Sequence, residues 1–351
     1  MKKGWEVKKL GDIFKFEYGK PLPDYRRKPD GAYPVYGANG EKDRTDEYYH
    51  DKPSIIVGRK GSAGEINLSE ERFWPLDVTY FVTFDNNKYH LKCLYYLLDN
   101  LDLTKLAKGV KPGINRNEVY AIKAYIPPLP EQHRIVSILD EAFEVIAKAK
   151  DNAEKNLQNA RDLFESYLES VDAKKELLGE LVNITTGKLD ANAATENGNY
   201  PFFTCSREIF KIDKYAFDCE AMLLAGNNAV GDFNVKHFQG KFNAYQRTYV
   251  ITVNKESRIL YRYLYYQLLK SLKEFKKQSV GVGTKFLKIG MINNLRISLP
   301  SISEQQHVVA KLDAISAETK KLEAIYQKKL ADLEELKKSI LQKAFEGELT
   351  D

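Results

Sequence analysis

An internal repeat constrains the fold of this chain more than any other feature of its sequence. The segment PPLPEQHRIVSILD, which begins at Pro127, aligns with PSISEQQHVVAKLD, which begins at Pro300, at an offset of 173 residues. Further upstream, the triplet Leu-Tyr-Tyr recurs at 94–96 and 264–266, at an offset of 170 residues. Because the offset changes so little, the two copies differ only by short insertions. A tandem duplication predicts two similar structural units in one chain.

Each copy consists of a globular block followed by a long helix. Strand-like apolar runs lie at 55–58, 78–84, 221–226 and 247–253, and apolar residues at helical spacing lie at 91–101 and 260–272. The blocks are therefore predicted to be mixed α/β, in an α+β fold. The predicted boundaries are 1–130 for the first block, 131–172 for the first helix, 173–303 for the second block and 304–351 for the second helix.

The two predicted long helices contain no glycine or proline through their middle parts. A segment of about 42 residues at 1.5 Å per residue gives a rod of roughly 60 Å. A narrow apolar seam between charged flanks predicts a coiled coil in which the two helices pack against each other. The seam residues are expected to be Ile135, Leu139, Ile146, Ala153, Leu157, Phe164 and Leu168 in the first helix, and Leu312, Ile315, Thr319, Leu322, Tyr326, Leu333, Leu336 and Ile340 in the second.

The net charge of +5 conceals an alternation of sign along the chain. The blocks 1–130 and 173–303 carry net charges of +4 and +8, whereas the helical segments 131–172 and 304–351 carry −5 and −2. Clustered positive charge favours binding to a polyanion. We therefore expect the globular blocks to contact nucleic acid and the acidic helices to face protein or solvent.

The sequence contains no recognisable catalytic constellation. Cys93, Cys205 and Cys219 are far apart and the five histidines are scattered singly, which disfavours both a disulfide framework and a metal site. The phosphate-loop pattern GxxxxGK[ST] and the dinucleotide pattern GxGxxG are absent. No apolar signal core or run of 18 apolar residues occurs. We expect a soluble, cytoplasmic protein with no catalytic, cofactor-binding or metal-binding residues of its own.

The polar loops of the basic blocks contain the candidate DNA contacts. Basic side chains bind phosphates, and arginine and asparagine can form paired hydrogen bonds with guanine and adenine, respectively. Arg59 and Lys60 in the first glycine-rich loop are suited to guanine, and Asn227 and Asn228 in the second are suited to adenine. The alternative is that they are ordinary turn residues. The complete set of candidates is Tyr36, Asn39, Arg59, Lys60, Ser62, Lys108, Lys111, Arg207, Asn227, Asn228, Thr284 and Lys285.

The chain resembles the specificity subunit of type I restriction–modification enzymes in four features. These are the two-unit layout, the opening motif that follows Trp5, the two proline–Glu–Gln motifs and the long helices after them. The resemblance extends over essentially the whole chain, and the repeated proline–Glu–Gln helix entry is its most specific part. The second copy departs from the pattern because Ser301 and Ser303 stand where the first copy has Pro128 and Pro130, and it opens without tryptophan.

This resemblance implies that 1–130 and 173–303 are target recognition domains, each of which reads half of a split site in double-stranded DNA. It implies that the helices form an antiparallel coiled coil, with the copies related by a pseudo-two-fold axis. Two modification (methyltransferase) subunits would dock there, and motor-nuclease restriction subunits could join them. S-adenosylmethionine, ATP and Mg²⁺ are then expected only on these partners, and the chain itself is expected to be non-catalytic.

Polar residues at the helix entries are the candidate docking residues for these partners. Glu131, Gln132 and Asp140 of the first copy recur as Glu304, Gln305 and Asp313. Repeated polar residues at equivalent places predict two equivalent docking sites. The alternative for the two glutamates is a helix-capping role, because a carboxylate in the first turn is stabilised by about 0.3–1 kcal/mol.

Two other classes of function remain to be weighed. A stand-alone DNA methyltransferase or nuclease would require a methyl-donor loop with an Asn/Asp-Pro-Pro-Tyr strand end, or a two-acid metal site, and the sequence has neither. A coiled-coil adaptor without DNA affinity would not require two basic blocks.

Overall fold

The chain folds into two compact units in a computed structural model, which describes residues 4–171 and 173–349. Unit 1 comprises residues 1–153 and 327–351, and unit 2 comprises residues 154–326. Each unit therefore contains one globular block together with the adjoining parts of both long helices. The outermost residues of the predicted segments 1–130, 131–172 and 304–351 lie outside the described residues.

Unit 1 contains three small sheets. The strands in order of hydrogen bonding are β1 (Glu6–Lys9) and β9 (Lys123–Ile126); β2 (Phe14–Tyr18), β8 (Thr79–Phe84), β5 (Ser54–Gly58) and β6 (Ile66–Ser69); and β4 (Gly40–Thr45), β3 (Tyr33–Gly37) and β7 (Trp74–Pro75). The short helices are α1 (Leu91–Leu101) and α2 (Arg116–Ala121), with 3-10 turns at Leu10–Asp12, Asp24–Arg26 and Leu103–Leu106. Among the described residues of unit 1, the strand pairs are antiparallel except that of β3 with β7.

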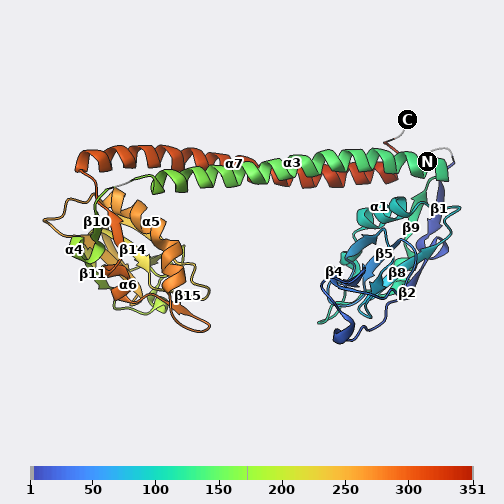
Figure 1. Ribbon diagram of the computed structural model, residues 1–351, viewed down its shortest axis with the longest axis horizontal. Coiled ribbons are helices and arrows are strands. Elements are labelled where there is room, and N and C mark those ends of the chain that lie inside the picture. Colours follow the sequence, from blue (N-terminus) through green and yellow to red (C-terminus); the bar gives the residue numbers. More distant parts are fainter. Residues whose placement is uncertain (1–3, 172, 350–351) are drawn as a thin grey trace. The chain divides into compact units, whose positions relative to one another are not determined.

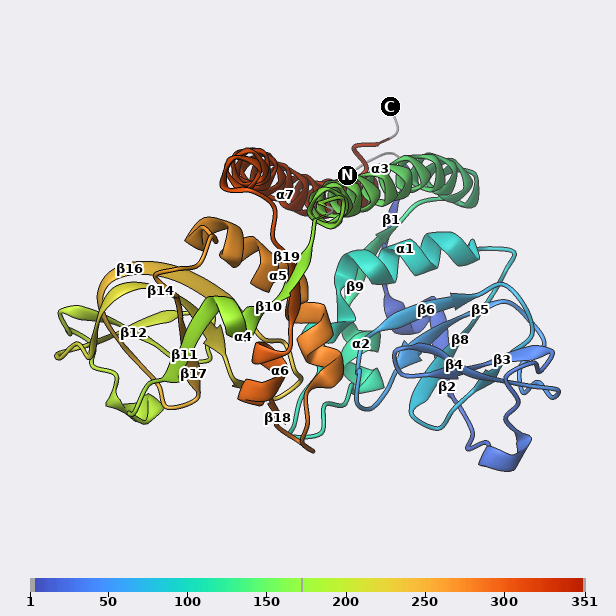
Figure 2. The ribbon, with the colours of Figure 1, turned by 60° about the vertical axis from the view of Figure 1, so that its left-hand side comes forward.

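The core of unit 1 lies around α1, which packs between the four-stranded sheet and the long helices (Figure 2). The central strand β5 reads Ser-Ile-Ile-Val-Gly and is buried at every position, as expected for a strand covered on both faces. Ile135 of the first long helix and Phe345 of the second belong to the same apolar cluster as Leu94 of α1. The globular block and the helix segments of this unit therefore share one core.

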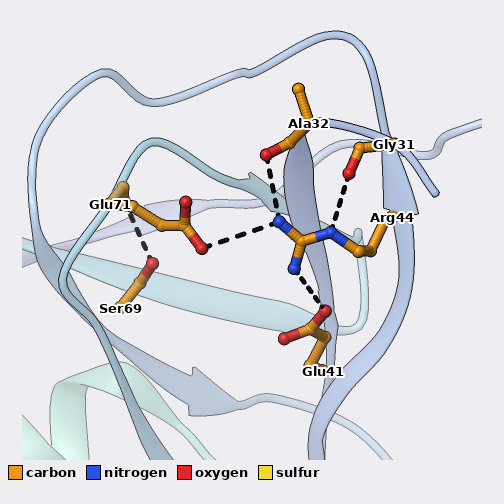
Figure 3. Close-up of polar contacts among 6 residues, drawn as sticks. All are labelled: Gly31, Ala32, Glu41, Arg44, Ser69 and Glu71. Carbon is orange, nitrogen blue, oxygen red and sulfur yellow. Dashed lines mark hydrogen bonds and ion pairs between the residues drawn. The ribbon is translucent and has the colours of Figure 1, made fainter.

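Arg44 on β4 holds the small three-stranded sheet of unit 1 to its neighbouring turns (Figure 3). Its Nε donates to the carbonyl oxygen of Gly31 at 2.7 Å, and its Nη2 donates to that of Ala32 at 3.0 Å. Nη1 donates to Glu41 at 2.9 Å, and Glu71 lies 3.8 Å from Nη2. With its guanidinium occupied in this way, Arg44 has a structural role.

Unit 2 is built around a larger, six-stranded sheet. Its strands are β11 (Val182–Thr186), β17 (Thr248–Val253), β14 (Phe217–Ala225), β16 (Val235–Ala244), β12 (Tyr200–Phe203) and β13 (Ile209–Ile212), and two-stranded ladders join β10 (Lys175–Leu177) to β19 (Arg296–Ser298) and β15 (Asn227–Asn228) to β18 (Lys285–Phe286). The helices are α4 (Leu178–Leu181), α5 (Tyr261–Gln278) and α6 (Ile289–Asn293), with a 3-10 turn at Ala191–Ala193.

The sheet of unit 2 is covered by apolar residues on both faces. Along β14, Met222 and Leu224 join the cluster that contains Tyr263 of α5, whereas Ala221 and Leu223 join a second cluster. This alternation follows from the two-residue period of a strand. The strands and helices predicted at 55–58, 78–84, 91–101, 221–226, 247–253 and 260–272 are thus confirmed as β5, β8, α1, β14, β17 and α5.

The two long helices are α3 (Leu129–Glu169) and α7 (Ile302–Glu346). They lie side by side within each unit (Figures 1 and 2). In unit 1, Lys150 Nζ contacts Glu334 Oε1 at 2.9 Å, and Ile135 shares the core with Phe345. The residue number falls along α7 as it rises along α3, so the predicted antiparallel pairing is confirmed in this unit.

In unit 2, Arg161 Nε contacts Glu323 Oε1 at 2.8 Å, and Leu168 of α3 shares a core cluster with Leu312 of α7. The pairing is therefore antiparallel here as well. Among the described residues, no helix combines the length and apolar character that a membrane span requires.

The predicted phase of the seam on α7 was wrong at two positions. Leu322 and Leu336 are 37% and 47% exposed, so they do not lie in the seam. Glu323, three residues before the half-buried Tyr326, faces α3 through its ion pair with Arg161. Because a charged residue occupies this seam position, the spacing of the apolar residues alone indicated the wrong phase of the seven-residue repeat.

Candidate nucleic-acid interface

In unit 1, two loops that are distant in sequence meet at the end of the four-stranded sheet. The glycine-rich loop 59–62 follows β5, and the hairpin 108–113 precedes α2. The N–H of Gly61 donates to the carbonyl oxygen of Pro112 at 2.9 Å, and the N–H of Ile114 donates to that of Arg59 at 3.1 Å. The structure thus brings together five residues predicted as DNA contacts: Arg59, Lys60, Ser62, Lys108 and Lys111.

Arg59 is held in a defined orientation within this pair of loops. Its Nε and Nη2 both donate to the carbonyl oxygen of Asp77, at 3.1 and 2.7 Å. Its guanidinium carbon lies 5.3 Å from the centre of the Tyr18 ring, in a cation–π contact. On the side of the guanidinium opposite Asp77, one hydrogen on Nη1 and one on Nη2 remain available as a pair of donors. This side is what a bidentate contact to guanine would use.

The lysines around Arg59 differ in their charge partners. Lys60 and Lys111 are exposed, and neither forms an ion pair with any residue that the structure describes. Lys108, in contrast, contacts Glu118 at 2.9 Å, and so its charge is already compensated. Lys60 and Lys111 are therefore the stronger candidates for phosphate contacts.

Unit 2 has an equivalent pair of loops. The loop 226–228 follows β14, and the hairpin 280–286 is closed by two hydrogen bonds between the backbones of Val280 and Phe286. The N–H of Leu287 donates to the carbonyl oxygen of Gly226 at 2.9 Å, as the N–H of Ile114 does to Arg59 in unit 1. This register places Gly226 at the position of Arg59 and Asn227 at the position of Lys60.

Several candidates in unit 2 have intramolecular roles. The Oδ1 atom of Asn228 accepts hydrogen bonds from the N–H groups of Val230 and Asp232, at 2.9 and 3.1 Å, which is the turn role considered as the alternative. Arg207 contacts Asp232 at 2.7 Å. Asn227, by contrast, uses its backbone to pair with β18, and its side chain forms no hydrogen bond with a described residue.

Lys285 and Thr284, predicted as contacts, both lie in the hairpin 280–286 and are half-buried. Lys285 forms no ion pair within the described chain. Beside it, the guanidinium of Arg247 lies 5.2 Å from the centre of the Phe286 ring. Lys236 on β16, whose ammonium group donates to Ser206 and Asn234, is half-buried, and burial lowers the pKa of this group.

Two further predicted contacts, Tyr36 and Asn39, come from β3 and the turn after it, where the carbonyl oxygen of Ala38 lies against Gly58. Tyr36 was predicted as a DNA contact, but its side chain is 9% exposed and packs against Phe73 with ring centres 5.8 Å apart. It is therefore a core residue. Asn39 is exposed in the turn between β3 and β4.

Two functional candidates were missed in the sequence. Arg116 at the start of α2 lies 5.5 Å from the centre of the Tyr18 ring, the same ring that Arg59 contacts. Tyr18 itself is 47% exposed. Because these residues come from three separate segments, only the fold reveals that they belong to one site.

The glutamines predicted to dock a partner are buried. Gln132 is 2% exposed, and its Oε1 accepts a hydrogen bond from the N–H of His90 at 2.8 Å. Its Nε2 donates to the carbonyl oxygens of Lys88 and Pro127, at 3.1 and 2.9 Å. Gln132 is therefore not available to a partner and instead ties the start of α3 to the start of α1.

Gln305 makes the same three contacts in unit 2, where it is fully buried. Its Oε1 accepts from the N–H of Leu260 at 2.9 Å, and its Nε2 donates to the carbonyl oxygens of Arg258 and Pro300, at 2.7 and 2.9 Å. The repeat of Gln132 as Gln305 therefore reflects a repeated intramolecular role.

The recurring aspartates complete this arrangement about two turns further along each long helix. In unit 1, Asp140 accepts a hydrogen bond from Tyr96 at 2.5 Å and contacts Lys92 at 3.1 Å. Burial, reinforced by the hydrogen bond to Asp140, raises the pKa of the Tyr96 hydroxyl. We call Gln132 and Asp140, with their contacts to α1, the polar anchor of unit 1.

In the polar anchor of unit 2, formed by Gln305 and Asp313, Asp313 binds Tyr266 at 2.5 Å and Arg262 through Nε at 2.9 Å. Burial opposes ionisation of Asp313, but the hydrogen bonds from Arg262 and Tyr266 outweigh it and hold its pKa below the usual range. Each polar anchor fixes a long helix to the recognition block of its own unit.

The recurring glutamates are exposed or half-buried at the first helical turn. Glu304 accepts hydrogen bonds from the backbone N–H and the hydroxyl of Ser301, at 2.9 and 2.6 Å. This is the capping role considered as the alternative, and Ser301, the departure from the first copy, supplies the other half of the capping box. Glu131, the equivalent residue in unit 1, lies in the first turn of α3.

Each of the two α/β blocks has an equivalent pair of loops and is fixed to the antiparallel helices, so the chain contains the same architecture twice. The family model for the type I restriction modification DNA specificity domain matches residues 2–156 and 171–332. The chain belongs to this family. The resemblance predicted from the sequence is thereby confirmed.

Characterised relatives carry the same designation. The chain is 41% identical over 180 residues to the EcoDI specificity subunit of Escherichia coli, a match that covers 51% of this chain and 39% of that subunit. It is 26% identical to the MjaVIII specificity subunit of Methanocaldococcus jannaschii, over 98% of this chain and 93% of that one. These relatives are named as specificity subunits, in agreement with a non-catalytic role.

Solved structures show that the fold is shared. A chain from a study of complex assembly and conformational transition in a type I restriction–modification system superposes with a TM-score of 0.74, at 18% identity, over 99% of both chains. The HsdS subunit of Thermoanaerobacter tengcongensis superposes with a TM-score of 0.52, at 18% identity, over 99% of this chain and 98% of that one. The predicted fold class is therefore confirmed. Among the described residues, no group of three or more potential ligands could hold a metal ion.

Proposed function

We propose that this chain is the sequence-specific DNA-binding subunit of a type I restriction–modification complex, and that it reads a bipartite site. The observation that carries the proposal is the recurrence of one loop pair in both units, with Lys60 and Lys111 in unit 1 and Lys285 in unit 2 as uncompensated cations. Lysines without an ion-pair partner among the described residues, exposed at Lys60 and Lys111 and half-buried at Lys285, are suited to contact the phosphates of a duplex. A stand-alone enzyme or a coiled-coil adaptor would not use two such sites.

The side chains around the two loop pairs differ, with Arg59 in one unit and Asn227 in the other. The two half-sites should therefore differ in sequence and should not form a palindrome. Co-expression with a modification subunit of a type I system, followed by genome-wide mapping of methylated bases, should reveal two short defined elements separated by unspecified bases. Discovery of one contiguous motif without a gap would refute the bipartite proposal.

The outer faces of the long helices support recruitment of partner subunits. Val145 on α3 and Leu336 on α7 are 62% and 47% exposed in unit 1, and Leu163 and Ile325 are 60% and 59% exposed in unit 2. Apolar side chains of this kind on an acidic helix pair are suited to pack against helices of another protein. We assign them to two copies of the modification subunit, which would supply S-adenosylmethionine, and the restriction subunits would supply ATP and Mg²⁺ chemistry.

The assembly should contain two modification subunits for each copy of this chain. Light scattering of the co-purified complex measures this ratio. Leu336→Asp and Ile325→Asp should each reduce the ratio toward one without unfolding the chain, because neither side chain lies in the helix seam. Gln306→Ala on the exposed surface of α7 serves as the control. A one-to-one complex that methylates both half-sites would contradict the assignment.

A further inference from the structure

The tips of the two hairpins carry the most exposed large apolar side chains among the described residues. Val110 and Val282 are each fully exposed, at 104%, whereas the next most exposed residue of this kind is Tyr25 at 81%. Each valine follows a glycine, Gly109 or Gly281. The fold therefore displays one valine at the same place in each unit.

Both hairpins are closed by a pair of backbone hydrogen bonds below the tip. In unit 1, the backbones of Lys108 and Gly113 exchange two hydrogen bonds of 3.0 Å below the tip. Gly109 has a φ of 95° and Gly281 one of 120°, a region of backbone conformation that favours glycine. The side chain of valine is itself stiff at χ1, so it loses little freedom when it is immobilised.

Cations lie next to each apolar tip. Lys111 follows Val110 directly, and Lys60 is on the loop that is bridged to the same hairpin. In unit 2, Lys285 lies three residues after Val282. If these lysines contact phosphates, each tip would lie in a groove of the duplex, against the base pairs.

The rest of the tip differs between the units, which indicates what the valine recognises. After the valine, unit 1 continues with Lys111 and Pro112, whereas unit 2 continues with Gly283 and Thr284. Residues that read different half-sites are expected to differ. A residue that is the same in both tips is expected to contact what both half-sites have in common, namely the stacked base pairs of any duplex.

We propose that Val110 and Val282 are apolar wedges, one for each half-site, that press into a base step of the target and partly unstack it irrespective of sequence. Apolar side chains are inserted between base steps in this way by proteins that kink DNA. The inference rests on the proposed DNA-reading function and adds a specific distortion of the bound duplex to it.

The test compares the full chain with its double variant V110A/V282A, and Val7→Ala serves as the control because Val7 is 50% exposed on β1, outside the loop pair. Binding is measured to duplexes that contain the methylated motif and to random duplexes, over a range of salt concentrations. The double variant should bind both kinds of duplex about tenfold more weakly, as expected from the removal of buried methyl groups. The salt dependence should not change, because no cation is removed.

A second readout follows the bases directly. In duplexes that carry 2-aminopurine at successive positions of the two half-sites, the wild-type chain should raise the fluorescence at one step in each half-site, and V110A/V282A should abolish the increase. Unchanged affinity and fluorescence in the variant would overturn the wedge. A loss limited to the cognate duplex and reproduced by uracil in place of thymine would also overturn it, in favour of a thymine-methyl contact. Absence of salt-dependent DNA binding by the wild type would refute the proposed function itself.

Discussion

Replacing Gln132 with alanine should lower the free energy of unfolding of unit 1 by about 3 kcal/mol. The substitution removes an amide that is 2% exposed and leaves the N–H of His90 and the carbonyl oxygens of Lys88 and Pro127 without their partner. A buried polar group without a partner costs about 1–3 kcal/mol, although water entering the vacated space offsets part of that cost. The same argument applies to Gln305→Ala in unit 2.

The two tryptophans make this prediction specific to one unit. Trp5 and Trp74 both belong to unit 1, so tryptophan fluorescence follows the unfolding of that unit during urea denaturation. Gln132→Ala should shift the fluorescence transition to lower urea. Gln305→Ala should shift the circular dichroism transition and leave the fluorescence transition nearly unchanged. If the fluorescence transition of Gln132→Ala occurs at the same urea concentration as that of the surface variant Gln306→Ala, the polar anchor does not stabilise the unit.

Charge reversal at the two hairpins should cause the largest loss of DNA affinity. Lys111→Glu and Lys285→Glu together remove two phosphate contacts and add two repulsive charges. Binding should weaken by about two orders of magnitude on all sequences alike, and the salt dependence of the logarithm of the binding constant should decrease by about 2. Filter binding to cognate and random duplexes over a salt series measures both quantities.

Two comparisons make this result interpretable. Lys148→Glu on α3 should leave DNA binding unchanged, because that lysine already contacts Glu144 and lies away from the loop pair. Arg59→Ala should instead reduce discrimination at one base pair, with a loss of about 1–3 kcal/mol on the cognate duplex only. Equal losses on cognate and random DNA would show that Arg59 contacts phosphate alone.

Local periodicity was sufficient to predict two strands and one helix in the globular block of each unit. The apolar runs at 55–58 and 221–226 became the buried strands β5 and β14, and the helical spacing at 91–101 became α1. This agreement has a physical cause, since the spacing of apolar side chains determines both which element forms and which face it buries. The duplication then predicted that this combination of strands and helix occurs in both units.

The same periodicity did not establish the phase of the helix seam. Leu322 and Leu336 keep an apolar spacing along α7, yet they are exposed, whereas Glu323 faces α3. An ion pair with Arg161 allows a charged residue to occupy the seam, and that partner is 162 residues away in the chain. No pattern within the helix contains this information.

The candidate site shows the same division between what the sequence predicts and what only the fold decides. Sequence alone determined the duplication, the alternating charge, the absence of catalytic motifs and the family. It also marked Gln132 and Gln305 as important, because each recurs at an equivalent place. Only the tertiary structure decided that these amides are buried and that Arg59 and Arg116 share the Tyr18 ring. The physical reason is that burial and hydrogen-bond partners depend on segments far apart in the chain, whereas a repeat reveals only that two environments are alike.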